Sequence, residues 1–461
     1  MPPTCPFRQV FTDPDGLSSR PERSATIAAG ARVGSLPAFP AAEAGVSRQE
    51  AVVPALGSRR RRRVGRIAKW FAVVACACSL ATAGYLAYVG VRRQQPVALP
   101  ALDGSYQVGR VTFEWTDRSR VDPLAPRPGR SRALSVWLWY PTLSATAGSA
   151  ASYAPGAWQQ LHLPGLVGWF ETDFAKVSIH AREHVPVAAG RFPVVVLEPG
   201  LGFSAPQYQA LAEGLASHGY LVAGLTPTYS ANVSVLDGHV LHATPAGNPP
   251  DLGGHSGRAG AAADRLVDVW AADAHFVAAR VTELARTSAF AGRIDTSAVA
   301  YVGHSFGGAA SLQACATDPR CRTAVDVDGT QFGTVVQTGL HVPFMVLTSA
   351  GSCVSGTCQV GSQEDDADRA AARSLLAAST GHERCYAITG TRHFNFTDDA
   401  ALYLAPPVRA LFALGSIQGQ RGLAIQNRVI AGFLDHALHR GPAATPTPAV
   451  RHDEVRDLCS P

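Results

Sequence analysis

Short apolar runs alternate with longer helical patterns along most of this chain. The short runs are rich in apolar residues with high strand propensity, and the longer stretches repeat apolar positions at helical spacing. The predicted strands are residues 134–140, 192–197, 220–225, 298–302, 323–327, 343–347 and 385–388. The predicted helices are residues 208–217, 261–286, 309–316, 366–378 and 423–438. This alternation predicts an α/β fold, a mainly parallel sheet with helices on both faces, with its core at about residues 105–440 of a domain spanning 94–461.

A different pattern precedes that domain. Residues 70–91 contain no charged side chain, and such a stretch is about 33 Å long as a helix, enough to cross a bilayer. Seven basic residues precede it between positions 59 and 69, whereas only Arg92 and Arg93 follow it closely. The positive-inside rule then puts the N-terminus in the cytoplasm and everything after the span outside. We therefore expect one transmembrane signal anchor over residues 67–91.

Three other interpretations of this segment stay open. The first is a signal peptide cleaved after Ala81-Thr82-Ala83, which would release the protein. The second is a lipoprotein signal acylated at Cys76, and the third is a buried core helix. The lipoprotein reading has a short apolar region, and a core helix would not begin beside five consecutive arginines. Residues 1–66 lack a sustained period and are predicted as a disordered basic cytoplasmic tail, or as the product of a mistaken start codon. We expect the end, residues 441–461, to be irregular.

The charge distribution argues against a nucleic-acid partner. The net charge is +5, but 14 of the 40 Lys and Arg residues and 5 of the 35 acids lie before residue 94. The remainder carries 26 basic and 30 acidic residues, a balance of −4. The basic excess therefore belongs to the N-terminal segment, and the main domain has no reason to bind a polyanion.

Cysteine placement agrees with an external main domain. Six cysteines follow the span, an even number that suits disulfides in an oxidising compartment. The close pairs Cys315/Cys321 and Cys353/Cys358 suit short loops, which leaves Cys385/Cys459. Zinc is the competing interpretation, although no C-x-x-C motif occurs. We expect neither a metal nor a cofactor.

Residues 303–308 carry the strongest chemical signal. They read Gly-His-Ser-Phe-Gly-Gly, which fits the G-x-S-x-G nucleophile-elbow pattern. A predicted strand precedes the motif and a predicted helix follows it, so Ser305 would occupy a tight strand-to-helix turn at the carboxyl end of the sheet. This context predicts Ser305 as a nucleophile, with His304 only an elbow residue.

A serine needs a histidine to take its proton, and in this fold the acid and then the histidine follow the serine in the chain. His393 follows the strand at 385–388 through a loop, where a catalytic base should lie; His341 and His382 enter strands or leave helices. Asp328 is the preferred acid because it lies beyond the end of a strand and precedes a glycine. Asp326 is the alternative, or a satisfied polar residue on that strand.

An oxyanion hole needs two backbone N–H donors. One comes from the residue after the nucleophile, Phe306, and the other from the loop after an early strand, where we assign Leu201. Glu198, at the start of that loop, is predicted to cap it or to be solvated, and is not assigned a catalytic role.

Five stretches together resemble the platelet-activating factor acetylhydrolase family in its bacterial form. The resemblance spans roughly residues 105–438, and its motifs agree in order and spacing. The stretches are Gly-Leu-Gly at 200–202, Leu-Ala-Ser-His-Gly-Tyr-Leu-Val-Ala at 215–223, the elbow at 303–308, Asp-Gly at 328–329 and His-Phe-Asn-Phe at 393–396.

The resemblance implies an α/β-hydrolase fold and a calcium-independent lipase that cleaves short or oxidised acyl chains from phospholipids. It implies that Ser305, Asp328 and His393 form the triad, with Leu201 and Phe306 at the oxyanion hole. One departure concerns the substrate, because Glu198-Pro199 stands where the family commonly has a His before the Gly-Leu-Gly run.

Two alternative functions stay open. A related hydrolase acting on polyesters, triglycerides or cell-envelope lipids would have the same triad, because the shape of the acyl pocket cannot be read from the sequence. A catalytically silent membrane-tethered binding module is a third reading, which the intact serine, acid and histidine disfavour. Trp158, Trp169 and Phe170 are candidates for a lipid-facing entrance, with core packing as the alternative.

Overall fold

A computed structural model of the protein describes residues 57–250, 252, 257–287, 289–352, 363–438 and 453–458. The chain divides into two units, the first ending at Ala87 and the second beginning at Tyr88. The second unit contains the sheet and all the candidate site residues. Residues 1–56 of the predicted tail lie outside the described residues. Helix α1 (Gly57–Arg93) begins within the remainder of that tail.

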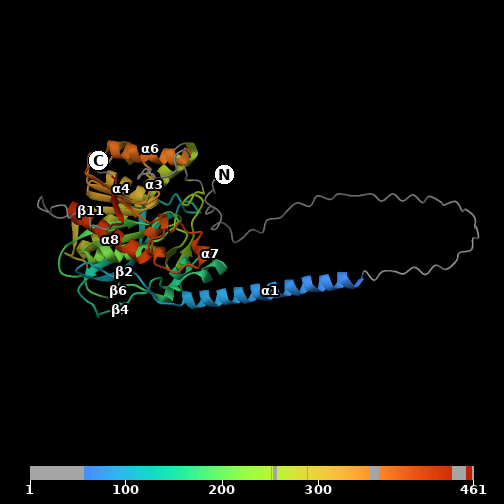
Figure 1. The fold of residues 1–461 in the computed structure, drawn as a ribbon. Coiled ribbons are helices and arrows are strands. Elements are labelled where there is room, and N and C mark those ends of the chain that lie inside the picture. The colour runs from blue at the N-terminus through green and yellow to red at the C-terminus, as the bar shows by residue number, and fades with distance from the viewer. Residues whose placement is uncertain are drawn as a thin grey trace, which may run out of the picture. The chain divides into compact units, whose positions relative to one another are not determined.

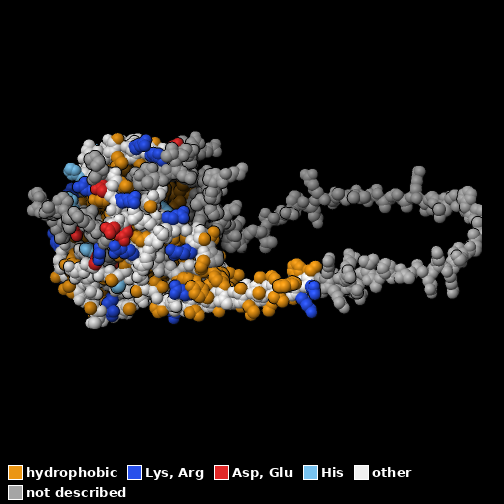
Figure 2. Space-filling model, viewed as in Figure 1, with side chains coloured by type: hydrophobic (Ala, Val, Ile, Leu, Met, Phe, Trp, Pro, Cys, Tyr) orange, Lys and Arg blue, Asp and Glu red, His pale blue; other side chains and the backbone are white. Residues whose placement is uncertain are grey.

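Helix α1 contains the apolar segment that the sequence singles out. Within residues 66–93 an 18-residue stretch has a mean hydropathy of 1.8, and within the described part of the chain this is the one helix long and apolar enough to cross a membrane. Trp70, Phe71 and Leu80 are 68%, 72% and 69% exposed. Figure 2 shows hydrophobic side chains along this helix. An anchor and a cleaved signal both predict such a helix, so the choice between them stays open.

The second unit is built on one large mixed sheet (Figure 1). Its six middle strands, from β14 to β8, are all parallel, and β15 and β3 flank them in antiparallel orientation. In spatial order the 11 strands are β15 (Val455–Asp457), β14 (Glu383–Ile388), β13 (Phe344–Ser349), β12 (Cys321–Val327), β11 (Ile294–His304), β7 (Phe192–Glu198), β8 (Leu221–Thr226), β3 (Ser131–Thr142), β2 (Gln107–Val121), β6 (Arg182–Glu183) and β4 (Ser149–Ala150). Two small pairs are β1 (Val97–Ala98) with β5 (Val177–Ser178), and β9 (Ser234–Leu236) with β10 (His239–Leu241).

Helices cover both faces of the parallel part. Two pack together on one face, α2 (Gln209–Ser217) and α8 (Gly419–Leu438). On the other face lie α3 (Gly257–Thr287), α4 (Phe306–Thr317) and α6 (Gln363–Ala378). Every residue of β7, β8 and β13 is buried, as expected for parallel strands covered on both sides. The predicted α/β architecture is confirmed.

Shorter helices connect these elements. The described α-helical turns are α5 (Val335–Thr338) and α7 (Pro406–Arg409). The described 3-10 helices are η2 (Gly156–Leu161), η3 (Gly165–Phe170), η4 (Phe174–Lys176), η5 (Ala205–Tyr208), η6 (His393–Phe396) and η7 (Asp398–Ala400).

Eight of the described strands were not predicted: β1, β2, β4, β5, β6, β9, β10 and β15. β2 alternates buried and exposed positions near the edge of the sheet, so it has no continuous apolar run, although it pairs with β3 over most of its length. β15 lies in the tail expected to be irregular, and that expectation is wrong for residues 455–457, which pair with β14. Chain ends without apolar patterning can still add an edge strand, because backbone groups alone form the ladder.

The described cysteines agree with disulfides. Cys315 and Cys321 are bonded, with their Cα atoms 5.2 Å apart, so zinc ligation by this pair is excluded. Cys385 is also disulfide-bonded. Cys353, Cys358 and Cys459 lie outside the described residues, so the pairings predicted for them stay predictions.

Candidate active site

The turn that carries Ser305 is as tight as the motif predicts. β11 ends at His304 and α4 begins at Phe306, so Ser305 is the single residue between strand and helix. Its φ of 57° lies in the left-handed region, which is strained for a residue with a side chain. A Cβ on Gly303 would lie 2.0 Å from the carbonyl oxygen of Gly307, so only glycine permits this close strand-to-helix packing.

Three loops at the carboxyl ends of parallel strands bring the predicted residues together. The Nε2 atom of His393 lies 3.0 Å from the Oγ of Ser305. The Nδ1 atom of the same imidazole lies 2.8 Å from Oδ2 of Asp328. His393 follows β14, Ser305 follows β11 and Asp328 follows β12. Along the chain Ser305 lies 88 positions before His393, and Asp328 lies 65 positions before it. The imidazole thus bridges the hydroxyl and the carboxylate, which is the geometry for general-base activation of a serine.

Asp328 is held in an ionised state. Its side chain is 6% exposed, and its Oδ1 accepts a 2.7 Å hydrogen bond from the backbone N–H of Ser349. Burial by itself would raise the pKa of Asp328, but the hydrogen bond and charge of His393, with the Ser349 N–H, hold the pKa below its ordinary value. The carboxylate is therefore charged at neutral pH and can stabilise an imidazolium.

Asp326 occupies a different environment two residues earlier. It is fully buried on β12 and accepts hydrogen bonds from the Gly329 N–H at 2.9 Å and the Gln331 amide at 2.7 Å. Burial raises the pKa of Asp326 to about 7 despite these bonds. It is a satisfied polar residue on the strand, and the imidazole of His393 is bonded to Asp328 instead.

The rival histidines lie at the wrong end of the sheet. His341 and His382 are both exposed and precede β13 and β14, so they lie at the amino ends of those strands. The Nδ1 atom of His341 is 2.7 Å from the hydroxyl of Thr380. Neither histidine is near the carboxyl ends from which Ser305 and Asp328 project.

The two predicted oxyanion donors are available to bind a substrate oxygen. Among the described residues, neither the backbone N–H of Leu201 nor that of Phe306 has a hydrogen-bond acceptor. The loop that carries Leu201 is fixed on both sides: the Phe203 N–H donates to the Gly200 carbonyl at 2.9 Å, and the Asn232 N–H donates to the Gly202 carbonyl at 2.9 Å. A fixed backbone with free N–H groups beside a nucleophile is what an oxyanion hole requires.

Glu198 differs from its prediction. It is neither a loop cap nor solvated, because β7 lies in the centre of the sheet and buries its last side chain completely. Its Oε2 accepts a 2.7 Å hydrogen bond from the Ser311 hydroxyl of α4. Burial raises the pKa of Glu198 well above its ordinary value. Glu198 therefore connects the end of β7 to helix α4, which follows the elbow.

The aromatic candidates divide into two groups. Trp158 is 6% exposed and packs edge-on against Trp137 at 5.6 Å, so core packing is the correct interpretation for it. Trp169 and Phe170 are half-buried.

A cluster of three aromatic rings adjoins the imidazole through Phe394, and none of the three was assigned a role from the sequence. The ring of Phe394, beside His393, lies 5.5 Å from that of Phe203 and 6.0 Å from that of Phe412. All three are half-buried, and they form an apolar border to the reaction centre. The alternation of apolar and polar residues gives no signal for them, because they lie in loops or in the short 3-10 helix η6.

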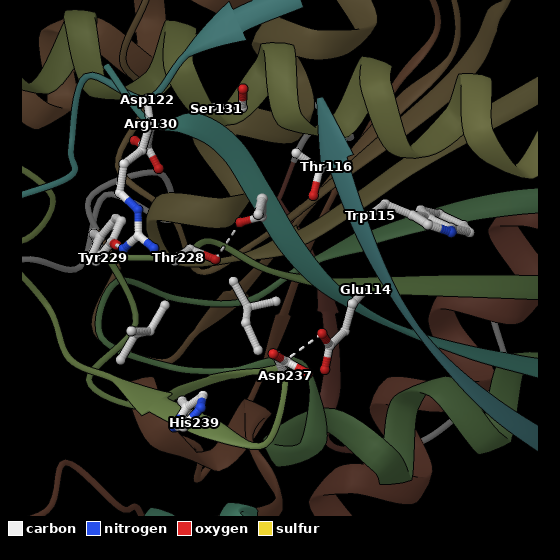
Figure 3. Close-up of a pocket in the computed structure, with 13 residues that line it drawn as sticks. Glu114, Trp115, Thr116, Asp122, Arg130, Ser131, Thr228, Tyr229, Asp237 and His239 are labelled. Carbon is white, nitrogen blue, oxygen red and sulfur yellow. Dashed lines mark hydrogen bonds between the residues drawn. The ribbon is translucent and has the colours of Figure 1, made fainter. Parts of the chain in front are cut away.

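A separate pocket of about 540 Å³ lies in the antiparallel half of the sheet (Figure 3). Arg130 and Tyr229 lie on one side of it, and Glu114 is hydrogen-bonded to the backbone of Asp237 on the other. None of the triad residues or oxyanion donors lines it. Among the described residues, no group of three or more His, Cys, Asp or Glu side chains could hold a metal ion.

The geometry agrees with comparisons to known proteins. A family model described as platelet-activating factor acetylhydrolase, isoform II, matches residues 278–442, which include Ser305, Asp328 and His393. The platelet-activating factor acetylhydrolase of Canis lupus familiaris is 27% identical over 251 residues, covering 50% of this chain and 54% of that protein. The alignment therefore spans about half the length of this relative. A solved ferulic acid esterase from Streptomyces cinnamoneus matches with a TM-score of 0.62 and 26% identity, over 78% of this chain and 99% of that one.

The fold and its structural relative define the class: the second unit is an α/β hydrolase of the esterase type. Within that class the chain is related to the platelet-activating factor acetylhydrolase family, and the resemblance carried by its motifs is confirmed.

Proposed function

We propose that this protein is a serine esterase that uses Ser305, His393 and Asp328 as its catalytic triad. The observation that carries the proposal is the continuous hydrogen-bonded chain from the Ser305 hydroxyl through the imidazole to the Asp328 carboxylate, with distances of 3.0 and 2.8 Å. The strained turn at Ser305 supports it, because such strain is retained where it exposes a nucleophile.

In this mechanism Ser305 Oγ attacks the acyl carbon of an ester while His393 Nε2 takes the hydroxyl proton. The carbonyl oxygen of the ester becomes an oxyanion, which the free N–H groups of Leu201 and Phe306 stabilise. Collapse of this intermediate breaks the bond to the alcohol, which leaves with the proton from His393. Water then attacks the acyl-enzyme and gives a proton to His393. Collapse of this second intermediate breaks the bond between the acyl carbon and Ser305 Oγ, which takes the proton back from His393 as the carboxylic acid leaves. Asp328 keeps the imidazole oriented and stabilises its positive charge in both halves.

For the substrate we propose short or oxidised acyl chains carried on phospholipids. The family match supports this choice, and so does the apolar border of Phe203, Phe394 and Phe412 beside the imidazole. An ester of an aromatic acid is the second candidate, favoured by the similarity to the ferulic acid esterase over nearly its whole length. The two candidates differ in the alcohol and acyl groups, so a substrate comparison separates them.

We further propose that α1 anchors the enzyme with its catalytic unit outside the cytoplasm. The residues that follow the span are firmly joined to the catalytic unit: the carbonyl of Arg93 accepts a 3.0 Å hydrogen bond from the Asp173 N–H. The Arg93 guanidinium lies 6.0 Å from the ring centre of Trp169, and that of Arg92 lies 5.2 Å from the ring centre of Tyr403. The last turn of the helix is thus fixed against two loops.

The segments around these two loops also expose apolar side chains. Leu166 and Val167, on η3, are 88% and 36% exposed, and Leu411, after α7, is 45% exposed. Phe412, next to Leu411, is half-buried and contacts Phe394, which adjoins His393. An exposed apolar surface beside the end of a membrane span suits contact with a bilayer, from which an ester lipid could enter.

The test uses the full chain in lipid nanodiscs without added calcium. We expect cleavage of p-nitrophenyl esters that is fastest for the short chains, and loss of activity by roughly 10⁴-fold or more in Ser305→Ala. Ser297→Ala is the matched control, because Ser297 is exposed at the amino end of the same strand. A 2-acetyl phospholipid and methyl ferulate are then compared. Folded protein that cleaves no ester and does not react with a fluorophosphonate would contradict the proposal.

A further inference from the structure

A buried chain of hydrogen bonds joins the oxyanion loop to the base. The backbone N–H of Gly200 donates to the hydroxyl oxygen of Tyr208 at 2.8 Å. That hydroxyl lies 2.9 Å from Nδ1 of His304, whose Nε2 lies 3.1 Å from the carbonyl oxygen of His393. Tyr208 and His304 are each 1% exposed, and neither belongs to the triad.

The direction of every bond in this chain follows from what each group can do. The Gly200 N–H can only donate, so the Tyr208 oxygen accepts there and must place its own hydrogen elsewhere. Among the described residues, Nδ1 of His304 is the only other partner of that hydroxyl. Nδ1 is therefore unprotonated and accepts, whereas Nε2 carries a hydrogen and donates to the His393 carbonyl, which can only accept. A proton on Nδ1 would leave the hydroxyl hydrogen of Tyr208 buried without an acceptor.

The surroundings keep His304 in this neutral form. Burial, and then the positive charge that His393 carries when protonated, lower the pKa of His304 to about 3, although the Asp328 charge and the bond to the His393 carbonyl act in the opposite direction. Burial likewise raises the pKa of Tyr208 well above its ordinary value, so the hydroxyl keeps its hydrogen. A second charge beside His393 would disfavour the imidazolium that catalysis requires.

The packing leaves little freedom for these groups to move apart. A Cβ built on Gly200 would lie 3.1 Å from Nδ1 of His304, 3.2 Å from the Tyr208 hydroxyl and 3.3 Å from Cβ of Ser305. The rings of His304 and His393 have centres 4.6 Å apart. A displacement of the tyrosine or of His304 would therefore move the backbone before Leu201 and the backbone of the base.

We propose that Tyr208 and His304 are positioning residues that couple the oxyanion loop to the catalytic base, with His304 acting as a neutral Nε2–H imidazole. Through Tyr208 the chain fixes Gly200, the residue before the donor Leu201. Through His304 it fixes the carbonyl of His393, and so the position of the His393 imidazole relative to the Ser305 hydroxyl. This proposal rests on the proposed function, since positioning matters only if Ser305 and His393 react.

The first test reads the hydrogen positions directly and needs no activity. Nitrogen-15 histidine spectra of the full chain in nanodiscs, assigned with His304→Gln, should show His304 as the Nε2–H form without change from pH 5 to 8. A charged His304 in that range, or an Nδ1–H form, overturns the proposal whatever the enzyme does.

The second test removes the hydroxyl. Tyr208→Phe leaves the Gly200 N–H without its acceptor, and we expect kcat for p-nitrophenyl acetate to fall by about 10- to 100-fold, with KM changed less than about threefold. Tyr301→Phe is the matched control. Tyr301 lies on the same strand as His304 but away from the elbow, and its buried hydroxyl donates to Asp318 at 2.6 Å. Equal kcat values in the two folded variants overturn the role of Tyr208.

Two substitutions at His304 separate the two ends of the chain. In His304→Gln the amide N–H can still reach the His393 carbonyl, but nothing accepts from Tyr208. In His304→Asn the shorter side chain can accept from Tyr208, but cannot reach His393. We expect only His304→Asn to shift the acidic limb of the kcat/KM pH profile, because that limb reports the base. Identical profiles in both folded variants contradict the coupling.

The outcomes distinguish a failure of the positioning role from a failure of the proposed esterase function. If the wild-type protein cleaves no ester, the proposed function fails, while the spectra still test the arrangement of hydrogens. If Ser305→Ala is inert and Tyr208→Phe matches Tyr301→Phe, the function stands and the positioning role is wrong. Should the His304 variants fail to fold, the comparison of Tyr208→Phe with Tyr301→Phe still decides.

Discussion

In the parallel half of the sheet Asp328 pairs with His393, whose side chain keeps 33% of its surface exposed. In the antiparallel half Arg132, on β3, pairs with Asp122 and Asp273, and all three side chains are at most 1% exposed. Both join a basic side chain to a carboxylate, but only the first has a face open to a reactant. The difference teaches that access, more than charge, separates a pair that can transfer protons from one that holds elements together.

The largest expected effect concerns the exposed pair. Asp328→Asn keeps the size of the side chain but favours the wrong tautomer of His393, and kcat should fall by roughly 10⁴-fold. Asp326→Asn is the matched control two residues away, where the acid does not contact the imidazole; we expect its kcat to change by less than about tenfold. Steady-state kinetics on p-nitrophenyl acetate measures both. Similar losses in the two variants would mean that the acid has been misassigned.

The next effect concerns the buried pair. Arg132→Met leaves Asp122 and Asp273 without the guanidinium that bonds both, and should lower the free energy of unfolding by about 3–5 kcal/mol. Because the network lies away from Ser305, kcat per folded molecule should stay the same. Arg120→Met is the control: Arg120 is 26% exposed and also bonds Asp273, so its loss should be smaller. Urea unfolding checks the order, and equal losses would contradict the role given to burial.

A pH-dependent effect sharpens the comparison inside the site. Since the pKa of His304 is lowered from 6.5 to about 3, the folded protein binds fewer protons there than the unfolded chain between these values. Its contribution to stability is therefore fully present above pH 6.5 and is lost as the pH falls toward 3. Relative to His304→Gln, the wild type should lose about 1.4 kcal/mol per pH unit below 6.5. Urea midpoints measured from pH 7.5 down to 4.5 test this, and the constant difference expected above pH 7 serves as the baseline.

The smallest expected effect concerns the exposed apolar loops. Leu166→Asp with Leu411→Asp should reduce cleavage of a 2-acetyl phospholipid in vesicles by about threefold to tenfold, because each places a charge where we propose contact with lipid. Cleavage of soluble p-nitrophenyl acetate should not change. Leu143→Asp is the control, since Leu143 is 72% exposed in the connection after β3. Equal losses on both substrates would indicate damage to the site and not loss of a lipid contact.

Much of this protein could be predicted from the sequence because its information is local. The apolar strands fill both faces of the sheet, so they read as continuous runs, and the elbow is a contiguous motif with a strand before it and a helix after it. Chain order and strand ends then single out Asp328 and His393. β2 escaped prediction because half of its positions face solvent at the edge of the sheet.

Only the tertiary structure decided what depends on contacts between distant segments. It showed that Asp328 reaches His393 while Asp326, two positions earlier, is enclosed with Gln331. It buried Glu198, because the position of β7 in the sheet is a property of the strand order and not of the residues around Glu198. It also brought Tyr208 to His304 across 96 positions of chain, where no spacing or motif could signal the bond. The sequence by itself thus determined the central strands, the main helices and the reactive groups, whereas burial and hydrogen bonding, which fix the charge and direction of those groups, came from the fold.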